Sequence, residues 1–248
     1  MAQCPNSAFS YTVRPGDTLW LIANRFHTDV NSILHSNPGV DLSVIYIGQT
    51  ICVPIVNTIG PFSGGGSIND AEQNLMNLLR MLWTQHVYWT RFFIISTVSD
   101  LPDAQLTADR LMRNPKDFEA ALRPLYGNTA AAYFSDLLTS HLSIAAELVE
   151  AAKAGNTDAA DNAEKRWYAN ADEIASFLGG VNPYWSSREW RRLLYDHLAM
   201  TKKEASDYIS GNFADSITTF DRIEKQALEM ADVMTNGIVR QFPNRFIP

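Results

Sequence analysis

Hydrophobic and polar positions follow two different patterns along the chain. Over residues 1–57, apolar residues form short β-branched or aromatic runs between turn residues, which is typical of short strands and helices. Over residues 68–248 they recur every three or four positions, which indicates amphipathic helices. Residues 58–67 are rich in Gly and Ser, and this composition predicts a flexible linker. We therefore expect two domains, 1–57 and 68–248, joined by residues 58–67.

The first domain is predicted to have the element order β-α-α-β. Pro15-Gly16-Asp17 is expected to turn the chain into the first helix, and Asn37-Pro38-Gly39 to end the second. The predicted elements are a strand at 11–13, helices at 19–26 and 30–36, and a strand at 50–54.

The second domain is predicted to be all-helical, with breaks where Pro, Gly-Asn or Gly-Gly interrupts the apolar period. The predicted helices span residues 70–97, 103–113, 115–126, 129–154, 157–179, 186–210 and 213–241. Five are long enough to form a bundle, and the two short ones are an insertion after the first long helix. The predicted fold class is therefore multidomain: a small α+β domain (βααβ) followed by a mainly-α helical bundle.

One polar residue interrupts the apolar stripe near the middle of four long helices. These residues are His86, His141, Asn170 and His197, and the three histidines are the only ones in the second domain. If the helices run up and down, the four side chains meet in one buried layer.

Two interpretations of this layer remain open. Three imidazoles could hold a transition metal such as zinc, copper, nickel or iron. Alternatively, they could form a polar network that fixes the helix register, with Asn170, Thr90, Thr201 or a buried tyrosine as partners. The helices lack the Glu-x-x-His pattern of di-iron bundles, which argues against a metal site of that class.

Two of the histidines lie in similar sequence surroundings. Residues 82–91 and 193–202 share the spacing Leu-x3-His-x3-Thr-(Arg/Lys). This similarity hints at a duplicated helical hairpin.

Four motifs follow one another in the first domain: YTVRPGDTLWLIA at 11–23, NPG at 37–39, IYIGQ at 45–49 and ICVP at 51–54. In this order and at this spacing they resemble a LysM domain. The resemblance implies binding of glycan that contains N-acetylglucosamine (GlcNAc), such as peptidoglycan or a chitin-like polymer. It places the groove between the loop after strand one and the loop before strand two. The residues carried over by position are Gly16, Asp17, Thr18, Leu19, Trp20, Asn37, Pro38, Val44, Ile45 and Tyr46.

Some of these residues could serve the fold of the domain and not glycan binding. Asp17 could cap the first helix and Leu19 could fill the core. Trp20 could be a core residue or a platform for a sugar ring. A single LysM domain is usually a weak binder, and oligomerisation through the bundle would add avidity.

Both cysteines, Cys4 and Cys52, lie in the first domain. In the LysM family the two strands pair, so a disulfide between these residues is sterically plausible. Closing a loop of this size would stabilise the fold by about 4 kcal/mol in the chain-entropy model, and a disulfide would indicate an extracytoplasmic location, at the cell wall or spore surface. The alternative is two free thiols in a cytosolic chain.

Composition narrows the classes of partner. The net charge of −7 argues against nucleic acid, and no apolar run approaches the length of a membrane span. The N-terminus also lacks the basic and apolar regions of a signal peptide, so none is expected in this chain.

Residues 70–243 resemble an uncharacterised helical domain of Gram-positive spore formers, a resemblance that implies no activity. Enzyme motifs are missing: the sequence lacks His-Glu-x-x-His, Gly-x-Ser-x-Gly and a cysteine outside the first domain. We therefore expect a non-enzymatic protein that LysM anchors on glycan while the bundle binds or assembles a partner. The alternatives are a metal- or ligand-binding bundle and a cell-wall hydrolase, for which Glu72, Glu147, Glu173 and Glu204 are the available acids.

Overall fold

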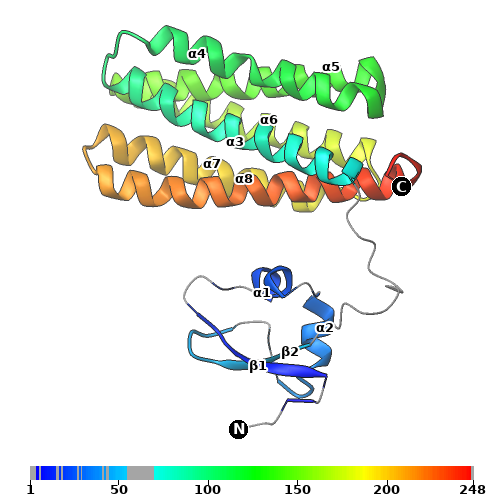
Figure 1. Ribbon diagram of the computed structural model, residues 1–248. Coiled ribbons are helices and arrows are strands. Elements are labelled where there is room, and N and C mark those ends of the chain that lie inside the picture. The colour runs from blue at the N-terminus through cyan, green and yellow to red at the C-terminus, as the bar shows by residue number, and fades with distance from the viewer. Residues whose placement is uncertain are drawn as a thin grey trace. The chain divides into compact units, whose positions relative to one another are not determined.

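The computed structural model describes residues 4–5, 7–14, 17, 19–26, 28, 30–40, 42, 45–54 and 70–246, except for the side chains of Trp20, Leu21, Asn24 and Asn31. The chain divides into two compact units, Met1–Gly66 and Ser67–Pro248 (Figure 1). The two units are described separately below.

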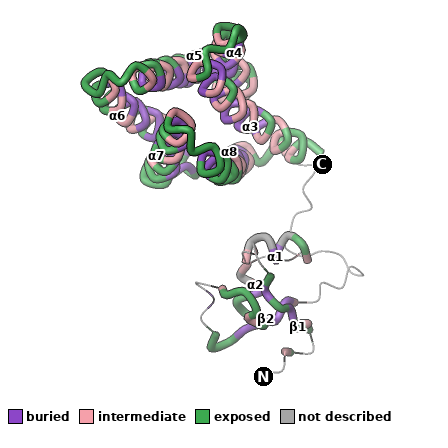
Figure 2. Tube along the Cα trace, turned by 90° about the vertical axis from the view of Figure 1, so that its left-hand side faces the viewer, coloured by how far each residue is buried: buried purple, intermediate pink, exposed green. Residues whose placement is uncertain are grey.

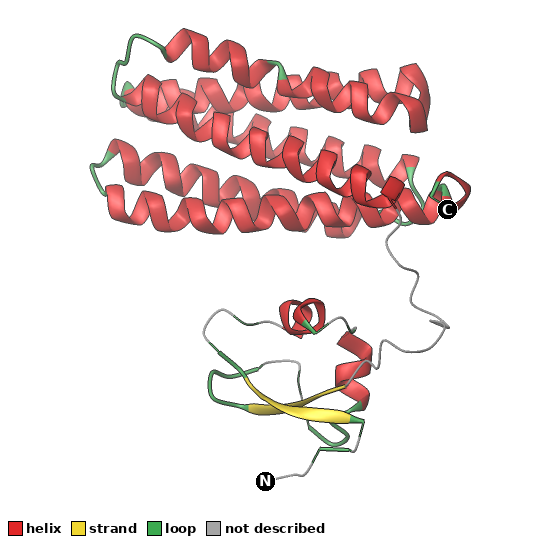
Figure 3. Cartoon of the chain, viewed as in Figure 1, coloured by secondary structure: helices red, strands yellow, loops and turns green. Residues whose placement is uncertain are grey.

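The N-terminal unit has the predicted order of elements. Strand β1 (Ala8–Thr12) is followed by helices α1 (Leu19–Arg25) and α2 (Val30–His35) and by strand β2 (Thr50–Pro54). The two strands pair antiparallel (Figure 3). In this pairing Ser10 lies opposite Cys52. Strand β1 begins three residues before the predicted strand, because its pairing with β2 extends back to Ala8.

The core of the N-terminal unit lies between this two-stranded sheet and the two helices. Ile22 of α1, Ile33 of α2 and Val53 of β2 are fully buried in it. A unit this small buries little apolar surface, so polar ties and the disulfide described below add to its stability.

The C-terminal unit is mostly helical over its described length. Its elements are α3 (Asp70–Val98), α4 (Ala104–Met112), α5 (Asn114–Lys153), α6 (Thr157–Val181), α7 (Ser187–Ile209), α8 (Phe213–Gln241) and the short 3₁₀ helix η1 (Pro243–Arg245). Helix α3 packs against α5 and α8, and the pairs α5–α6, α6–α7 and α7–α8 complete a closed ring of five helices. Figure 2 shows this ring roughly end-on, with α4 lying outside it against α3 and α5.

The two helices predicted at 115–126 and 129–154 form one element, α5, with a sharp bend at the predicted break. Gly127 has φ 78° and ψ 173° there, a conformation that glycine adopts without the steric cost borne by other residues. Only the part of α5 after Gly127 is long enough to pair with α6 along its length.

The core of the ring combines aliphatic side chains with several large aromatic ones. Trp83 of α3 and Trp190 of α7 stack with ring centroids 6.3 Å apart, and Phe118 packs edge-on against Trp83. A second, smaller apolar cluster lies where α4 covers the ring and contains Phe93 and Leu142. Among the described helices, none is long and apolar enough to cross a membrane.

Candidate glycan-binding site and the buried histidine layer

Asp17 of the N-terminal unit lies in a polar network, and its side chain is only 3% exposed. The Tyr11 hydroxyl donates to its Oδ2 at 2.5 Å, and the Arg14 backbone N–H donates to the same oxygen at 2.8 Å. The Arg25 guanidinium lies 3.0 Å from Oδ1. These contacts, led by the hydrogen bond from Tyr11, lower the pKa of Asp17. The carboxylate therefore ties β1 to the loop that follows it and to α1.

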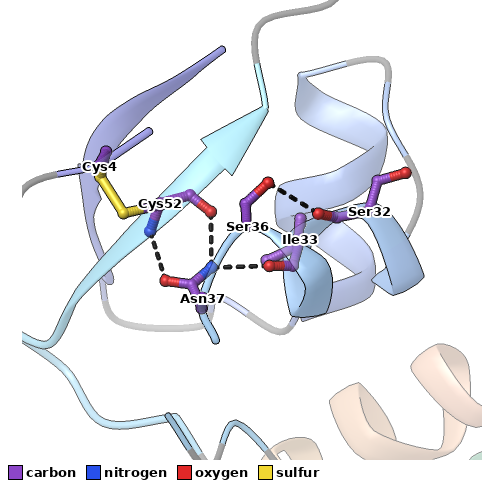
Figure 4. Close-up of a disulfide and its surroundings, with 6 residues drawn as sticks. All are labelled: Cys4, Ser32, Ile33, Ser36, Asn37 and Cys52. Atoms are coloured by element: carbon purple, nitrogen blue, oxygen red, sulfur yellow. Dashed lines mark hydrogen bonds between the residues drawn. A yellow bond between two sulfur atoms is a disulfide. The ribbon is translucent and has the colours of Figure 1, made fainter. Parts of the chain in front are cut away.

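The carboxamide of Asn37 joins the end of α2 to β2 (Figure 4). Its Nδ2 donates to the carbonyl oxygens of Ile33 and Cys52, both at 2.7 Å, and its Oδ1 accepts from the Cys52 N–H at 2.8 Å. Asn37 thus satisfies the backbone groups of Cys52 much as another strand would. The buried amide is used inside the unit and fixes the position of the loop that begins at Pro38.

The loop before β2 lies beside the end of the first strand. Val13 accepts a backbone hydrogen bond from Gly48 and donates one to Gln49, both at 2.8 Å. The Tyr46 N–H donates to Gln49 Oε1 at 2.8 Å, which closes the turn that carries the loop. The two loops of the predicted groove therefore start from one hydrogen-bonded junction.

The candidate glycan-binding residues differ in what they present to solvent. Tyr46 is 68% exposed and Pro38 is also exposed, whereas Leu19 and Ile45 are half-buried. Three of the predicted groove residues lie outside the described part of the chain: Gly16, Thr18 and Val44. The side chain of Trp20 also lies outside it. The neighbouring Ile47, which the sequence prediction did not include, is 70% exposed.

The predicted disulfide between Cys4 and Cys52 is present, with a Cα–Cα distance of 5.4 Å (Figure 4). It fastens the segment before β1 to the middle of β2. Because Cys52 is also the backbone partner of Asn37, one residue of β2 connects three segments of the unit.

The structure brings the three histidines of the C-terminal unit together. The ring centroid of His86 lies 5.8 Å from that of His197 and 6.3 Å from that of His141. All three side chains are buried, and Asn170 is buried beside them.

Two carboxamides set the protonation of two of these rings. The Nδ1 atom of His86 lies 3.2 Å from Asn114 Oδ1, and that of His141 lies 2.9 Å from Asn170 Oδ1. Both amide nitrogens donate to backbone carbonyls, of Leu82 and Leu137 respectively. The amide oxygens are therefore left as acceptors, and this network assigns the imidazole proton to Nδ1 in both rings.

Burial keeps the histidine layer neutral at physiological pH. It lowers the pKa of His86 to about 4 and that of His141 to about 3. The pKa of His197 also falls well below its usual value, mainly through burial and secondarily through the two other histidines.

The metal-binding interpretation of the layer is not supported. Within the described residues, no group of three His, Cys, Asp or Glu side chains is placed to hold a metal ion. Two of the rings instead turn Nδ1 toward the carboxamides of Asn114 and Asn170, which is the polar network of the alternative interpretation. Asn114 is the partner that the sequence prediction missed, and Thr90 donates to the His86 carbonyl at 2.7 Å and not to a ring.

A buried ion pair lies farther along α3 and α7 than the layer, between Arg91 and Glu204. Glu204 is only 2% exposed, and its Oε1 lies 2.5 Å from the guanidinium of Arg91, which also donates to Ser216. Burial raises the pKa of Glu204 to about 7 despite the opposing effect of Arg91. The pair joins α3, α7 and α8. Of the other three acids considered for a hydrolase, Glu147 is paired with Arg166 at the surface.

Comparison with known proteins concerns the N-terminal unit. The LysM domain family model matches residues 11–54. The secreted LysM effector Blys4 of Beauveria bassiana is 40% identical over 50 residues, which are 20% of this chain and 29% of that protein. The chain thus spans less than a third of this relative's length, and no solved structure matches it. Neither finding supports the resemblance of residues 70–243 to a domain of spore formers.

Proposed function

We propose that this chain, whose residues 11–54 are a LysM domain, is held on GlcNAc-containing glycan by that domain and carries a non-enzymatic helical unit there. A LysM domain indicates binding of such glycan, in peptidoglycan or in chitin. The family match is the observation that carries the proposal, and the junction of the two loops at Val13 agrees with it.

The proposed groove has a wall of side chains and a supporting frame. Leu19, Pro38, Ile45 and Tyr46 supply apolar surface for the N-acetyl methyl group and the sugar face. Asp17 and Asn37 hold the loops in place through the contacts described above. Gly16, Thr18, Trp20 and Val44 remain groove residues on the resemblance alone.

We place the protein outside the cytoplasm, at a cell wall or spore surface. The disulfide between Cys4 and Cys52 supports this location because such bonds persist in oxidising compartments. The relative from Beauveria bassiana is described as secreted, which agrees with the same location.

Tyr46→Ala tests the groove in the full-length chain. The side chain is mostly exposed and its hydrogen bond to Gln49 uses only the backbone, so the fold should be retained. We expect the affinity for insoluble peptidoglycan or chitin, measured by co-sedimentation, to fall about tenfold, or roughly 1.4 kcal/mol.

Tyr133→Ala is the matched control, since Tyr133 is a tyrosine of α5 that is 51% exposed. Its binding should equal that of the wild type. Unchanged sedimentation of the Tyr46 variant would place the groove elsewhere. Absence of wild-type binding to both polymers would reject the proposed anchor. Parallel titrations with GlcNAc oligomers and muropeptides would identify the preferred glycan.

For the helical unit we propose binding or assembly of a partner, with oligomerisation as one route to greater avidity. The second candidate function is that of a ligand-binding bundle. A cavity beside the histidine layer favours it, and its chemistry points to a class of ligand.

A further inference from the structure

A cavity of about 210 Å³ lies inside the helical unit, at the end where α4 covers the ring. Helices α3, α5, α6 and α7 contribute most of its walls, and α4 contributes Leu111. The smaller apolar cluster lines it, including Phe93, Ile94, Leu142 and Val149.

The cavity exists because the side chains at this end of the ring are too small to fill the space between the helices. Toward the other end, Trp83, Trp190 and Phe134 fill the centre. Around the cavity, five lining positions are alanines: Ala145, Ala146, Ala152, Ala160 and Ala205. An empty apolar cavity lowers the stability of a fold, so a ligand that fills it would stabilise this one.

The repeated Leu-x3-His-x3-Thr pattern leads from the aromatic core to the cavity. In both copies the histidine lies in the buried layer, and the threonine one turn later, Thr90 or Thr201, lines the cavity. Trp167, whose ring lies 5.3 Å from that of His141, lines it as well.

Two buried hydrogen-bond donors border the cavity without partners. Thr90 Oγ1 donates to the carbonyl four residues earlier, as Thr139 and Thr235 do. Thr201 Oγ1 makes no such bond, and neither it nor the indole Nε1 of Trp167 has a partner among the described residues. Leaving a buried donor unpaired costs free energy, which a ligand with an acceptor oxygen would recover.

Charged side chains line the cavity where it meets the surface between α6 and α7. Lys202 Nζ is paired with Glu164 Oε2 at 2.6 Å, and Asp161 beside them is exposed. One ammonium group and two carboxylates give this opening a net negative charge. An anionic ligand is therefore disfavoured.

We propose that this cavity binds a small, neutral, mainly apolar molecule with one hydrogen-bond acceptor, of the size of an alkylated phenol. An apolar cavity of roughly 150 Å³ is enough for benzene, so this one has room for one ring and a few more heavy atoms. The acceptor oxygen pairs with Thr201 Oγ1, and the apolar part contacts the alanine walls. The site is independent of glycan binding by the other unit.

The test uses the full-length chain and 4-ethylphenol as the probe. Calorimetry should give saturable binding, and the methyl NMR signals of Ile94, Leu142 and Val149 should shift with the same dissociation constant. Ala145→Leu fills the cavity and should weaken binding at least tenfold. Ala169→Leu, at an exposed position of α6, should bind as the wild type does.

Thr201→Val separates the polar contact from the apolar one while keeping the side-chain shape. It should weaken the binding of 4-ethylphenol about fivefold and leave that of ethylbenzene unchanged. The wild type should bind 4-ethylbenzoate at least tenfold more weakly than the phenol.

The cavity site is overturned if the lining methyl signals do not move at saturating probe, or if a folded Ala145→Leu variant binds normally. Equal binding of the benzoate would overturn the preference for neutral ligands. Melting curves of each variant confirm that it is folded.

Discussion

At the scale of single residues, polar side chains of the N-terminal unit act through the backbone of distant segments. Asn37 satisfies both backbone groups of Cys52, and Asp17 joins β1 to α1. Both residues were predicted as parts of the groove, and both have their polar atoms engaged inside the unit. Sequence alone does not reveal the contacts of Asn37, because its partner Cys52 lies 15 positions away along the chain.

Asn37→Ala should destabilise the N-terminal unit by about 2 kcal/mol, since it leaves the Cys52 N–H and carbonyl unpaired in a buried position. Hydrogen exchange of the Cys52 amide, followed by NMR, measures this directly, because the amide loses its protection when the unit opens. Pro38→Ala, at the exposed neighbouring position, should exchange as the wild type does. Similar protection in both variants would show that water replaces the carboxamide.

Reduction of the disulfide should act on the N-terminal unit alone. The Cys4→Ser, Cys52→Ser double variant should lose about 4 kcal/mol of that unit's stability, because the bond closes a loop of 48 residues. Calorimetry should show the transition of the helical unit at an unchanged temperature, since both cysteines of the chain lie in the other unit. A shift of both transitions would mean that the units are coupled.

At the scale of elements, the helix boundaries follow from local sequence signals. The predicted helices agree with α3 to α8 to within two residues at most ends. For example, α5 and α7 end just before Gly155 and Gly211, which take positive φ as glycines after a helix commonly do. Asn114 was read as part of a break, and its bond to His86 was missed because nothing local marks a partner 28 residues away. The cavity was also missed, since an alanine that lines a void has the same sequence context as one at a tight helix contact.

Gly237→Ala should destabilise the helical unit by about 2–3 kcal/mol. A Cβ at this position of α8 would lie 1.9 Å from Nε1 of the buried Trp185. Gly180→Ala in α6 is the matched control, because no described atom lies within 4 Å of the added carbon. We expect it to raise the stability by about 0.5–1 kcal/mol through helix propensity. Urea unfolding of both variants checks the pair.

The buried ionisable groups predict how the stability of the helical unit depends on pH. The histidines have lowered pKa values in the fold. Their contribution to the free energy of unfolding is therefore complete above about pH 6.5 and is lost as the pH falls. Glu204 has a raised pKa, so its contribution is complete below about pH 4.5 and is lost as the pH rises through about 7.

The three histidines together take up more protons on unfolding near pH 5.5 than Glu204 releases, by roughly two. The stability of the helical unit should therefore fall by about 3 kcal/mol for each pH unit of acidification. Urea titrations between pH 7.5 and 5 measure this slope. His197→Leu should reduce it by about one proton, whereas His35→Leu, in the other unit, should leave it unchanged. A rise in stability on acidification, the effect of Glu204 alone, would mean that the imidazoles are accessible to water in the native state.

At the scale of the whole molecule, two units with different means of stabilisation share one chain. The N-terminal unit relies on a disulfide and polar ties around a small core, and the C-terminal unit relies on an aromatic core and a closed ring of helices. We propose residues 58–67 as the linker between them. Proteolysis within this segment should release two fragments that each retain their own melting temperature, and a large shift in either would show that the units depend on one another.

The ring of helices also sets the order in which the protein can be completed during synthesis. The helices α5 to α8 each pack on their predecessor, but the ring closes only when α8 meets α3, through Arg80 with Asp232 and Tyr88 with Glu224. These partners are separated by 136 residues or more. Until α8 has left the ribosome, the aromatic core is open along one side and prone to aggregate. Addition of α8 therefore closes the core of the ring, and we expect chains that terminate before residue 213 to be cleared by proteases.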